Sequence, residues 1–397
     1  MRTIFSVCLF AFVAGVMPIA AQSLSGTADT RLVLSAGAGG APDFSWGAEE
    51  YANLRLKVPV RDAAAFYGAF NLTAAAGSII NDARAYAAAT GADMPFIAGE
   101  NYAGSLELER LYLQINGDSI NWSAGLLRMP FGFGLVWGPM DFINPRNPLQ
   151  PDARLRGALG TIGSWYPVPG GDARLFAFAA APKDPLKQDG GGARFALGFE
   201  NHWEKASAQF LYSFETPAAY TPQFVPALEY SQGLHRAGLS LKADMELGFS
   251  AELLYTLDPA SPDGIRGLSA SAGADYSFFD GKLLVLAEYL YSGADSITAR
   301  NAANPAGYAG RHFLYVSGTW SLSDFTRINL GGAYAFDDLS ALPIAGWEHE
   351  PLQGITVYAR LQAPLDRESF DRGTGGELGP AANRTRVLGT AGVKVKF

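Results

Sequence analysis

Stretches of about ten residues in which apolar and polar side chains alternate recur along this chain, up to its last residue. In the clearest stretch, 267–278, one face carries Leu268, Ala270, Ala272, Ala274, Tyr276 and Phe278. The other face carries Gly267, Ser269, Ser271, Gly273, Asp275 and Ser277. Successive side chains of a β-strand point to opposite faces, so such a stretch predicts a strand with one apolar and one polar face. The pattern returns at 194–200, 355–363 and 386–397, and it predicts an all-β chain.

The length of these stretches favours a membrane barrel over a soluble sandwich. Soluble strands average about five or six residues, whereas a tilted membrane-spanning strand needs about nine to eleven. Tight turns near 61–62, 116–118, 170–172, 280–281 and 323–324 alternate with long connections at 75–103, 129–155, 216–233 and 294–310. Trp122, Trp203, Phe278 and Tyr289 lie near the ends of stretches, where aromatic girdles would be. We expect a single transmembrane antiparallel β-barrel with short periplasmic turns and long external loops; a soluble all-β fold is the alternative.

Composition excludes two other classes. Hydrophobic residues make up 48% of the 397 residues, which is enough to bury a core and excludes intrinsic disorder. Outside the N-terminus, no apolar run approaches the roughly 18 residues that a membrane helix needs, so a multi-helix membrane protein is excluded too.

The N-terminus has the features of a secretory signal peptide. Met1 and Arg2 give a short positive end, 7–21 is apolar, and Ala20-Ala21 offers small residues for cleavage before Gln22. We therefore divide the chain into a signal peptide, 1–21, and a barrel domain, 22–397. The single cysteine, Cys8, would be removed with the signal. Loss of Arg2, the only charged residue of that segment, takes the net charge from −8 to −9, which argues against nucleic acid as a partner.

The number of strands can be inferred from parity. Both ends of the chain should be periplasmic, so a closed barrel needs an even number of strands. The clear stretches give an odd number, and the region between 336 and 385 holds only one strong strand, 354–364. A weak strand near 342–350, with a turn at 350–354, restores the parity. The prediction is about 18 strands, with 16 as the alternative, and 365–384 as the last external loop.

Two runs of sequence resemble known families. The cysteine-free body and the final Val393-Lys394-Val395-Lys396-Phe397 resemble bacterial outer-membrane β-barrels, in which a C-terminal Phe is the signal read by the barrel-assembly machinery. The resemblance gives Phe397 that role. Within 109–149, the strands ERLYLQ and LLRMPFG followed by GLVWGPMDFINPRNPL resemble the alginate-export-type porins and related porin-like families. This second resemblance ends at that segment, so no substrate is carried over from it.

The polar faces predict which charges line the lumen. The basic residues assigned to it are Arg55, Lys57, Arg110, Arg194, Arg236, Lys242, Arg327, Arg360, Arg386, Lys394 and Lys396. The acidic ones are Glu200, Glu252, Asp275 and Glu288. A barrel of this size encloses water, and low-dielectric walls focus a positive field, so we expect anions to be favoured. The alternative is that several of these bases lie at the periplasmic rim or pair with acids and select nothing.

The connection 129–155 is expected to fold into the barrel as a constriction. It contains five prolines, at 130, 139, 145, 148 and 151, and many apolar side chains, so it should be stiff and should pack. Asp141, Arg146, Asp152, Arg154 and Arg156 would then lie at the narrowest point. The alternative is a plug that only braces the wall.

Catalytic and metal motifs are not found. His202, His235, His312 and His349 show no metal-ligand spacing, and no nucleophile-elbow or phosphate-loop motif occurs in a suitable context. We therefore expect no enzyme, no metal and no cofactor. The predicted function is an outer-membrane porin for passive passage of small hydrophilic, preferably anionic, solutes through a water-filled lumen. The alternatives are a plugged barrel that serves as an adhesin or scaffold, a polymer-export porin, and a fatty-acid-type transporter, for which 22–30 is a short plug. The expected partners are outer-membrane lipid, the assembly machinery and the solutes, with the chain as a monomer or weak oligomer.

Overall fold

The structure is a computed structural model that describes most of the chain. It covers residues 23–37, 44–61, 63–80, 97–144, 157–181, 192–217, 219–220, 228–229, 233–259, 267–293, 311–365, 378 and 385–397. The predicted signal peptide, 1–21, lies outside the described residues. Among the residues that are described, no helix is both long enough and apolar enough to cross a membrane.

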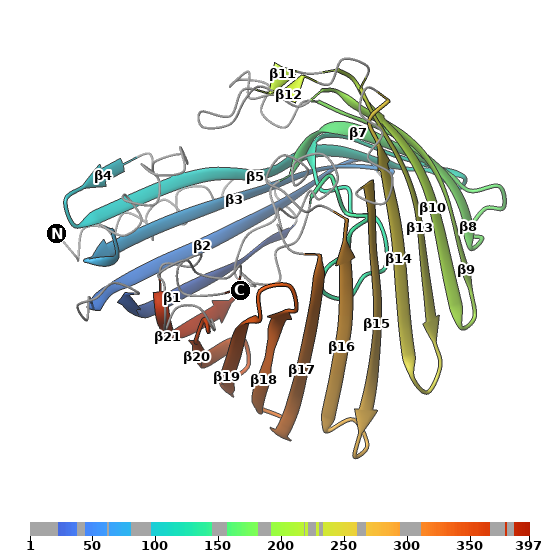
Figure 1. Cartoon of the computed structure of the whole chain (residues 1–397). Coiled ribbons are helices and arrows are strands. Elements are labelled where there is room, and N and C mark those ends of the chain that lie inside the picture. Colours follow the sequence, from blue (N-terminus) through green and yellow to red (C-terminus); the bar gives the residue numbers. More distant parts are fainter. Residues whose placement is uncertain are drawn as a thin grey trace.

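Eighteen antiparallel strands form one closed barrel. Figure 1 shows these strands wrapped around a common interior. The first nine are β1 (Ser23–Gly37), β2 (Phe44–Arg61), β3 (Ala64–Gly77), β5 (Tyr102–Asn116), β6 (Ile120–Leu127), β7 (Ala158–Trp165), β8 (Ala173–Ala180), β9 (Arg194–Trp203) and β10 (Ala206–Glu215). The others are β13 (Leu234–Asp244), β14 (Gly248–Leu257), β15 (Leu268–Phe278), β16 (Leu283–Ser292), β17 (His312–Ser323), β18 (Thr326–Ala335), β19 (Ser340–Leu352), β20 (Ile355–Gln362) and β21 (Thr385–Lys396). The short β4 (Ile97–Gly99) pairs with β5, and β11 (Ala219–Tyr220) pairs with β12 (Leu228–Glu229) in a separate small sheet. The predicted fold class is confirmed, with 18 strands rather than 16.

The strand that parity required is present. β19 includes the predicted 342–350, and a two-residue turn at 353–354 leads into β20. Pro343 explains why this strand is weak in the sequence, because proline cannot donate a ladder hydrogen bond and is rare inside sheets. The pairing of β19 with β20 runs up to Ile344 and Gln362, one residue from that proline.

The two ends of the chain close the barrel. β1 pairs with both β2 and β21, so the first and last strands are neighbours. The backbone N–H of Gly26 donates to the carbonyl of Phe397 at 2.7 Å, and the N–H of Phe397 donates back at 3.1 Å. An open edge in hydrocarbon would leave such groups unpaired at several kcal/mol each, so this seam is part of what allows the sheet to span a membrane.

Long connections lie at one end of the barrel and mostly tight turns at the other. The long ones join β3 to β5, β6 to β7, β10 to β13 and β16 to β17, as the sequence predicted. Tight turns join β2 to β3, β5 to β6, β15 to β16 and β17 to β18, also as predicted. Ser23 and Phe397 lie at the end with the tight turns, because their strands begin or finish there.

The two faces of the wall differ in burial. On β9, Phe195, Leu197 and Phe199 are exposed on the outer face, where a barrel meets lipid. The alternate residues Arg194 and Glu200 are buried although they face the interior of a wide barrel. Something must therefore cover this part of the inner wall.

Candidate functional site

The cover is the segment that follows β6. Residues 128–144 lie inside the ring of strands, where Figure 1 draws them in teal, and we call them the inner loop. The inner loop packs on the inner faces of β8 to β19 through two apolar clusters and a row of hydrogen bonds. It covers one arc of the wall.

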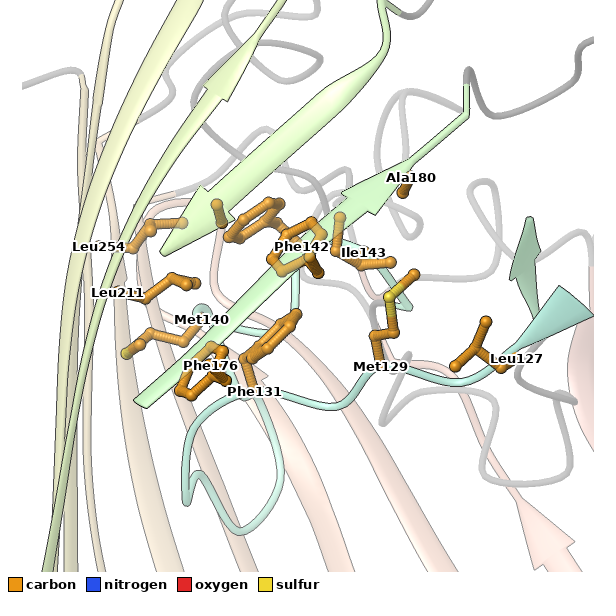
Figure 2. Close-up of a cluster of buried hydrophobic side chains, with 12 residues drawn as sticks. Leu127, Met129, Phe131, Met140, Phe142, Ile143, Phe176, Ala180, Leu211 and Leu254 are labelled. Carbon is orange, nitrogen blue, oxygen red and sulfur yellow. The ribbon is translucent and has the colours of Figure 1, made fainter. Parts of the chain in front are cut away.

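The first apolar cluster anchors both ends of the inner loop. Phe131 stacks on Phe176 and Phe178 of β8, with ring centroids 5.6 and 4.9 Å apart. Met140 and Phe142 return to the same cluster beside Leu211 and Leu254, as Figure 2 shows. Buried aromatic side chains of this size dominate the energetics of a contact, so the loop is held firmly here.

The second cluster anchors the middle of the inner loop. Trp137 is buried against Phe313 of β17, with ring centroids 5.7 Å apart. Leu290, Ala333 and Leu342, from β16, β18 and β19, complete the cluster. The loop therefore reaches well around the wall from its origin at β6.

Two wall carboxylates hold the backbone between these anchors. Glu288 of β16 accepts N–H bonds from Leu135, Val136 and Trp137, at 2.9, 2.7 and 3.2 Å. Glu252 of β14 accepts from Gly134 at 2.6 Å and from Met140 at 3.1 Å. Gln209 and Ser240 accept from Gly132 and Phe133, at 2.7 and 2.9 Å. Each bond satisfies a backbone donor in a buried or part-buried position, which makes the attachment costly to break.

Glycine allows this close approach. Gly132 has φ +82°, and a Cβ there would collide with a carboxylate oxygen of Glu252. A Cβ on Gly134 would lie 2.7 Å from the Cα of Gly138. Only glycine tolerates both the left-handed backbone and the contact, so the Gly132-x-Gly134 spacing reflects how the loop meets the wall.

Two of the predicted lumen arginines are not open to the lumen, and one of them, Arg236, lies beneath the inner loop. Arg194 and Arg236 do point inward, but both are buried. The Arg236 guanidinium lies over the ring of Phe142, 5.0 Å from its centroid, and pairs with Glu215 at 2.7 Å. Arg236 therefore supports the loop, and the buried Arg194, whose Nη2 donates to the carbonyl of Ala181 at 3.4 Å, is not exposed to a passing solute either.

The charged residues predicted within the loop divide into two groups. Asp141 is buried, and its carboxylate accepts from the N–H of Asn144 at 3.2 Å, so it shapes a turn of the loop. Arg146, Asp152, Arg154 and Arg156 lie outside the described residues. Their place at the narrowest point stays a prediction.

A polar network around Arg55 and Arg110 lies on the arc of the wall outside β8 to β19, where the inner loop, 128–144, packs. The Arg55 Nε donates to Asn53 Oδ1 at 2.6 Å, and Asn53 Nδ2 donates to Glu109 Oε2 at 2.8 Å. Arg110 pairs with Glu109 Oε1 at 2.9 Å. Glu109 was not predicted here, because alternation places it on the face opposite Arg110. A register shift between Ala69 and Phe70 forms a β-bulge at Glu109, which turns both Glu109 and Arg110 inward. Asn53 shares the inward face with Arg55, but the prediction assigned only charged residues.

Two of the other predicted arginines of the wall, Arg327 and Arg360, also lie on the inner face. Arg327 is exposed and is paired in register with Glu348. Arg360 lies on the same face of β20 as Tyr358, whose hydroxyl donates to the inward Asp29. The side chain of Arg386 is not described, although its residue begins β21.

The inner wall carries more acids than the sequence predicted. The acids on the inner face that the prediction missed include Asp29, Glu49, Glu107, Glu109, Glu215 and Glu348. Arg31 and Arg174 are inward bases that it also missed. Their register against inward residues of neighbouring strands shows their direction, and Glu49 shares the alternation of Arg55 on β2. The excess of positive charge over the whole wall is therefore smaller than predicted.

The inward charges nonetheless differ in exposure. Asp29, Glu109, Glu200, Glu252 and Glu288 are buried. Arg55, Lys57, Arg327 and Lys396 are exposed. Among the described inward charges, the fully exposed ones are therefore basic, while Glu49, Glu107, Glu215, Asp275 and Glu348 are partly exposed. Within the described part of the chain, no group of three or more His, Cys, Asp or Glu is placed to hold a metal ion.

Comparison with known proteins places the fold among bacterial porins. OccAB3 of Acinetobacter baumannii superposes with a TM-score of 0.53 at 10% identity, over 95% of this chain and 99% of that one. OccK8 (OprE) of Pseudomonas aeruginosa gives 0.53 at 9% identity, over 95% and 98%. At such low identity, these similarities show the fold alone. No family model and no curated protein matches the chain, so the alginate-export-type resemblance of 109–149 stays a prediction.

Proposed function

We propose that this chain is an outer-membrane channel through which small hydrophilic solutes, preferably anions, pass passively. The observation that carries the proposal is the unequal exposure of the inward charges, with buried acids beneath or beside exposed arginines and lysines. Low-dielectric walls focus the field of exposed charges into the lumen, so anions would be enriched there.

The position of the inner loop favours a channel over a plugged scaffold. The loop is bound to the inner faces of β8 to β19 by its own backbone. Side chains on the facing arc, Arg55 and Arg110 among them, keep contact with solvent about midway along their strands. The described part of this loop, 128–144, narrows the lumen from the side of β8 to β19, and 129–155 is our candidate constriction.

Export and assembly complete the proposal. Cleavage after Ala21 would deliver the mature chain to the periplasm. Phe397 would serve as the signal for the barrel-assembly machinery, with outer-membrane lipid as the surrounding partner. The exposed apolar outer face of strands such as β9 supports that location.

Planar-bilayer recording of the refolded mature chain tests the function. We expect stable conductance steps and a reversal potential in a KCl gradient that favours Cl⁻. A reversal potential favouring K⁺ would contradict the anion preference but would still support the channel function. Protein that is folded and heat-modifiable on a gel, yet gives no steps, would contradict the channel and favour a plugged adhesin or scaffold.

A further inference from the structure

We infer that Arg55 and Arg110 form an oxyanion-binding subsite on the inner wall, positioned by Glu109. The inference names the ligand class of the proposed channel and rests on that function. Its ligand is a small solute with an anionic oxygen group, a carboxylate or a phosphate, which accepts N–H bonds from both guanidinium groups.

The two arginines flank one small residue. Arg55 on β2 is paired with Ala69 on β3, and Ala69 is paired with Arg110 on β5. Neighbouring strands lie about 4.8 Å apart, so the two Cα atoms are about 10 Å from each other. The side chain of Ala69 is only a methyl group and is buried, which leaves the space above it to the two guanidinium groups.

Hydrogen bonds link the arginines into one unit. Asn53 accepts from Arg55 Nε at 2.6 Å and donates to Glu109 at 2.8 Å. Glu109 Oε1 accepts from Arg110 Nε at 3.1 Å and from its Nη2 at 2.9 Å. In these contacts, Arg55 donates only through Nε, and Arg110 donates through Nε and Nη2 but not through Nη1. The remaining guanidinium nitrogens are the donors available to a ligand.

A buried second layer holds this unit rigid. Asn53 Nδ2 also donates to Asn71 Oδ1 at 2.7 Å, and the Tyr51 hydroxyl donates to the same oxygen at 2.8 Å. Asn53 and Asn71 are each 2% exposed. Groups fixed in this way lose little conformational entropy on binding, which is the usual advantage of a preorganised site.

The local charge and shape select an oxyanion. The unit holds two guanidinium groups and one carboxylate, so it keeps a net positive charge, with the carboxylate of Glu107 one row nearer the long connections on the same inner face. One row nearer the tight turns, Lys57 lies over the ring of Tyr67 at 5.4 Å, and Tyr67 stacks on Tyr112 at 5.0 Å. A planar guanidinium matches two oxygens of one ligand, whereas a halide offers a single centre. Oxyanions should therefore bind here more tightly than chloride.

Glu109 acts as a positioning residue, and this role determines whether Glu109→Gln weakens or strengthens anion binding. If the arginines acted only as positive charge, Glu109→Gln would remove a negative charge and strengthen anion binding. If Glu109 positions them, the same change weakens oxyanion binding, because Arg110 loses its fixed partner. Glu109→Gln keeps the side-chain volume, which limits disturbance of the bulge.

The experiment measures acetate and inorganic phosphate on the folded, full-length mature barrel. The readouts are reduction of single-channel chloride current and NMR line broadening of ¹³C-acetate and of phosphate. We expect saturable effects that weaken about tenfold or more in Arg55→Gln and Arg110→Gln, and that also weaken in Glu109→Gln. Arg327→Gln, which removes an inward charge outside the network, is the matched control and should change them little.

The outcomes separate the subsite from the channel. Saturable broadening by acetate alone, or by phosphate alone, supports the subsite and identifies its ligand. Broadening without conductance steps keeps the subsite and overturns the channel. Conductance with no oxyanion effect, an equal loss in Arg327→Gln, or stronger binding in Glu109→Gln overturns the subsite and leaves the channel standing.

Discussion

Two hydrogen bonds join Trp137 and Glu288, one to the Glu288 side chain and one from the Trp137 side chain. The Trp137 backbone N–H donates to the Glu288 carboxylate at 3.2 Å, and the indole Nε1–H donates to the Glu288 backbone carbonyl at 3.3 Å. The carboxylate also accepts from Leu135 and Val136. This strand position therefore fixes three consecutive loop residues, which makes it the strongest single attachment of the inner loop.

Replacing Glu288 with Gln should loosen the inner loop. A Gln amide offers one oxygen where the carboxylate offers two, so at least one loop N–H would face an NH₂ group. Leaving one buried donor unsatisfied costs about 1–3 kcal/mol. We expect a loss of that size in the free energy of unfolding in lipid vesicles, together with noisier single-channel currents.

Glu348→Gln is the control for this change. Glu348 lies on the inner face of β19 opposite Arg327, away from the hydrogen bonds that hold the loop. Equal noise and equal stability in the two variants would show that the Glu288 carboxylate does not hold the loop.

Glycine substitutions separate backbone strain from collision with the wall. Gly132→Ala introduces a left-handed alanine and a Cβ that collides with Glu252. Gly138→Ala, at φ +50°, introduces strain alone, because no atom lies within 4 Å of its Cβ. We expect Gly138→Ala to cost about 1 kcal/mol and Gly132→Ala to cost about 1–3 kcal/mol more. Urea unfolding midpoints of the two variants measure the difference; identical midpoints would refute the close contact.

Removing the indole of Trp137 should free the middle of the loop. Trp→Ala in a packed core costs about 3–5 kcal/mol, and here the loss falls on the contact with Phe313. We expect Trp137→Ala to increase conductance, because the released segment no longer follows the wall. Trp203→Ala, which alters an exposed outer-face residue, is the control. An unchanged conductance in Trp137→Ala would place the narrowest point elsewhere.

Anion preference should depend on ionic strength. Exposed charges such as Arg55 and Arg327 act through water, whose screening length falls from about 10 Å at 0.1 M salt to about 3 Å at 1 M. We expect the Cl⁻/K⁺ permeability ratio to decrease steadily over that range of KCl. A ratio independent of salt would mean that selection occurs by size or by direct binding.

Deleting Phe397 should impair insertion of the barrel into the outer membrane of cells more than it impairs the stability of the folded barrel. Its ring packs over Gly26, and its backbone closes the seam between β21 and β1. The barrel retains the other pairs of that seam, so refolding in detergent should remain efficient. In cells, we expect a several-fold drop in barrel inserted in the outer membrane, measured by heat-modifiability on gels. A proportional loss in both assays would point to stability rather than an assembly signal.

The sequence predicted the barrel because its signals are local and periodic. Alternation defined the strands, and the requirement for an even number revealed β19 despite Pro343. Register was not predictable, because it depends on which residues of distant strands meet. The bulge at Glu109 shows the consequence: one extra residue brings an acid inward, and no local pattern marks it.

The candidate site was predicted in part. The inward direction of Arg55, Arg110, Arg194 and Arg236 followed from alternation. Alternation did not predict which of these arginines the inner loop would cover. That depends on contacts between residues more than 100 positions apart in the sequence, such as Gly134 with Glu252. Sequence patterns gave Glu252 and Glu288 the role of lumen charges, whereas both serve as acceptors for a backbone.

Because of the inner loop, one arc of the barrel wall should resist bending more than the other. From β8 to β19, the inner loop packs on the wall and is hydrogen-bonded to β10, β13, β14 and β16, so bending that arc would break those bonds. From β20 through β1 to β5, the ladder of the sheet and side-chain contacts such as that of Asn53 with Glu109 resist deformation. Lateral pressure from the bilayer would then act mostly on the second arc, which carries Arg55 and Arg110. The cross-section next to those arginines would thus respond to membrane tension, while the opposite side stays fixed.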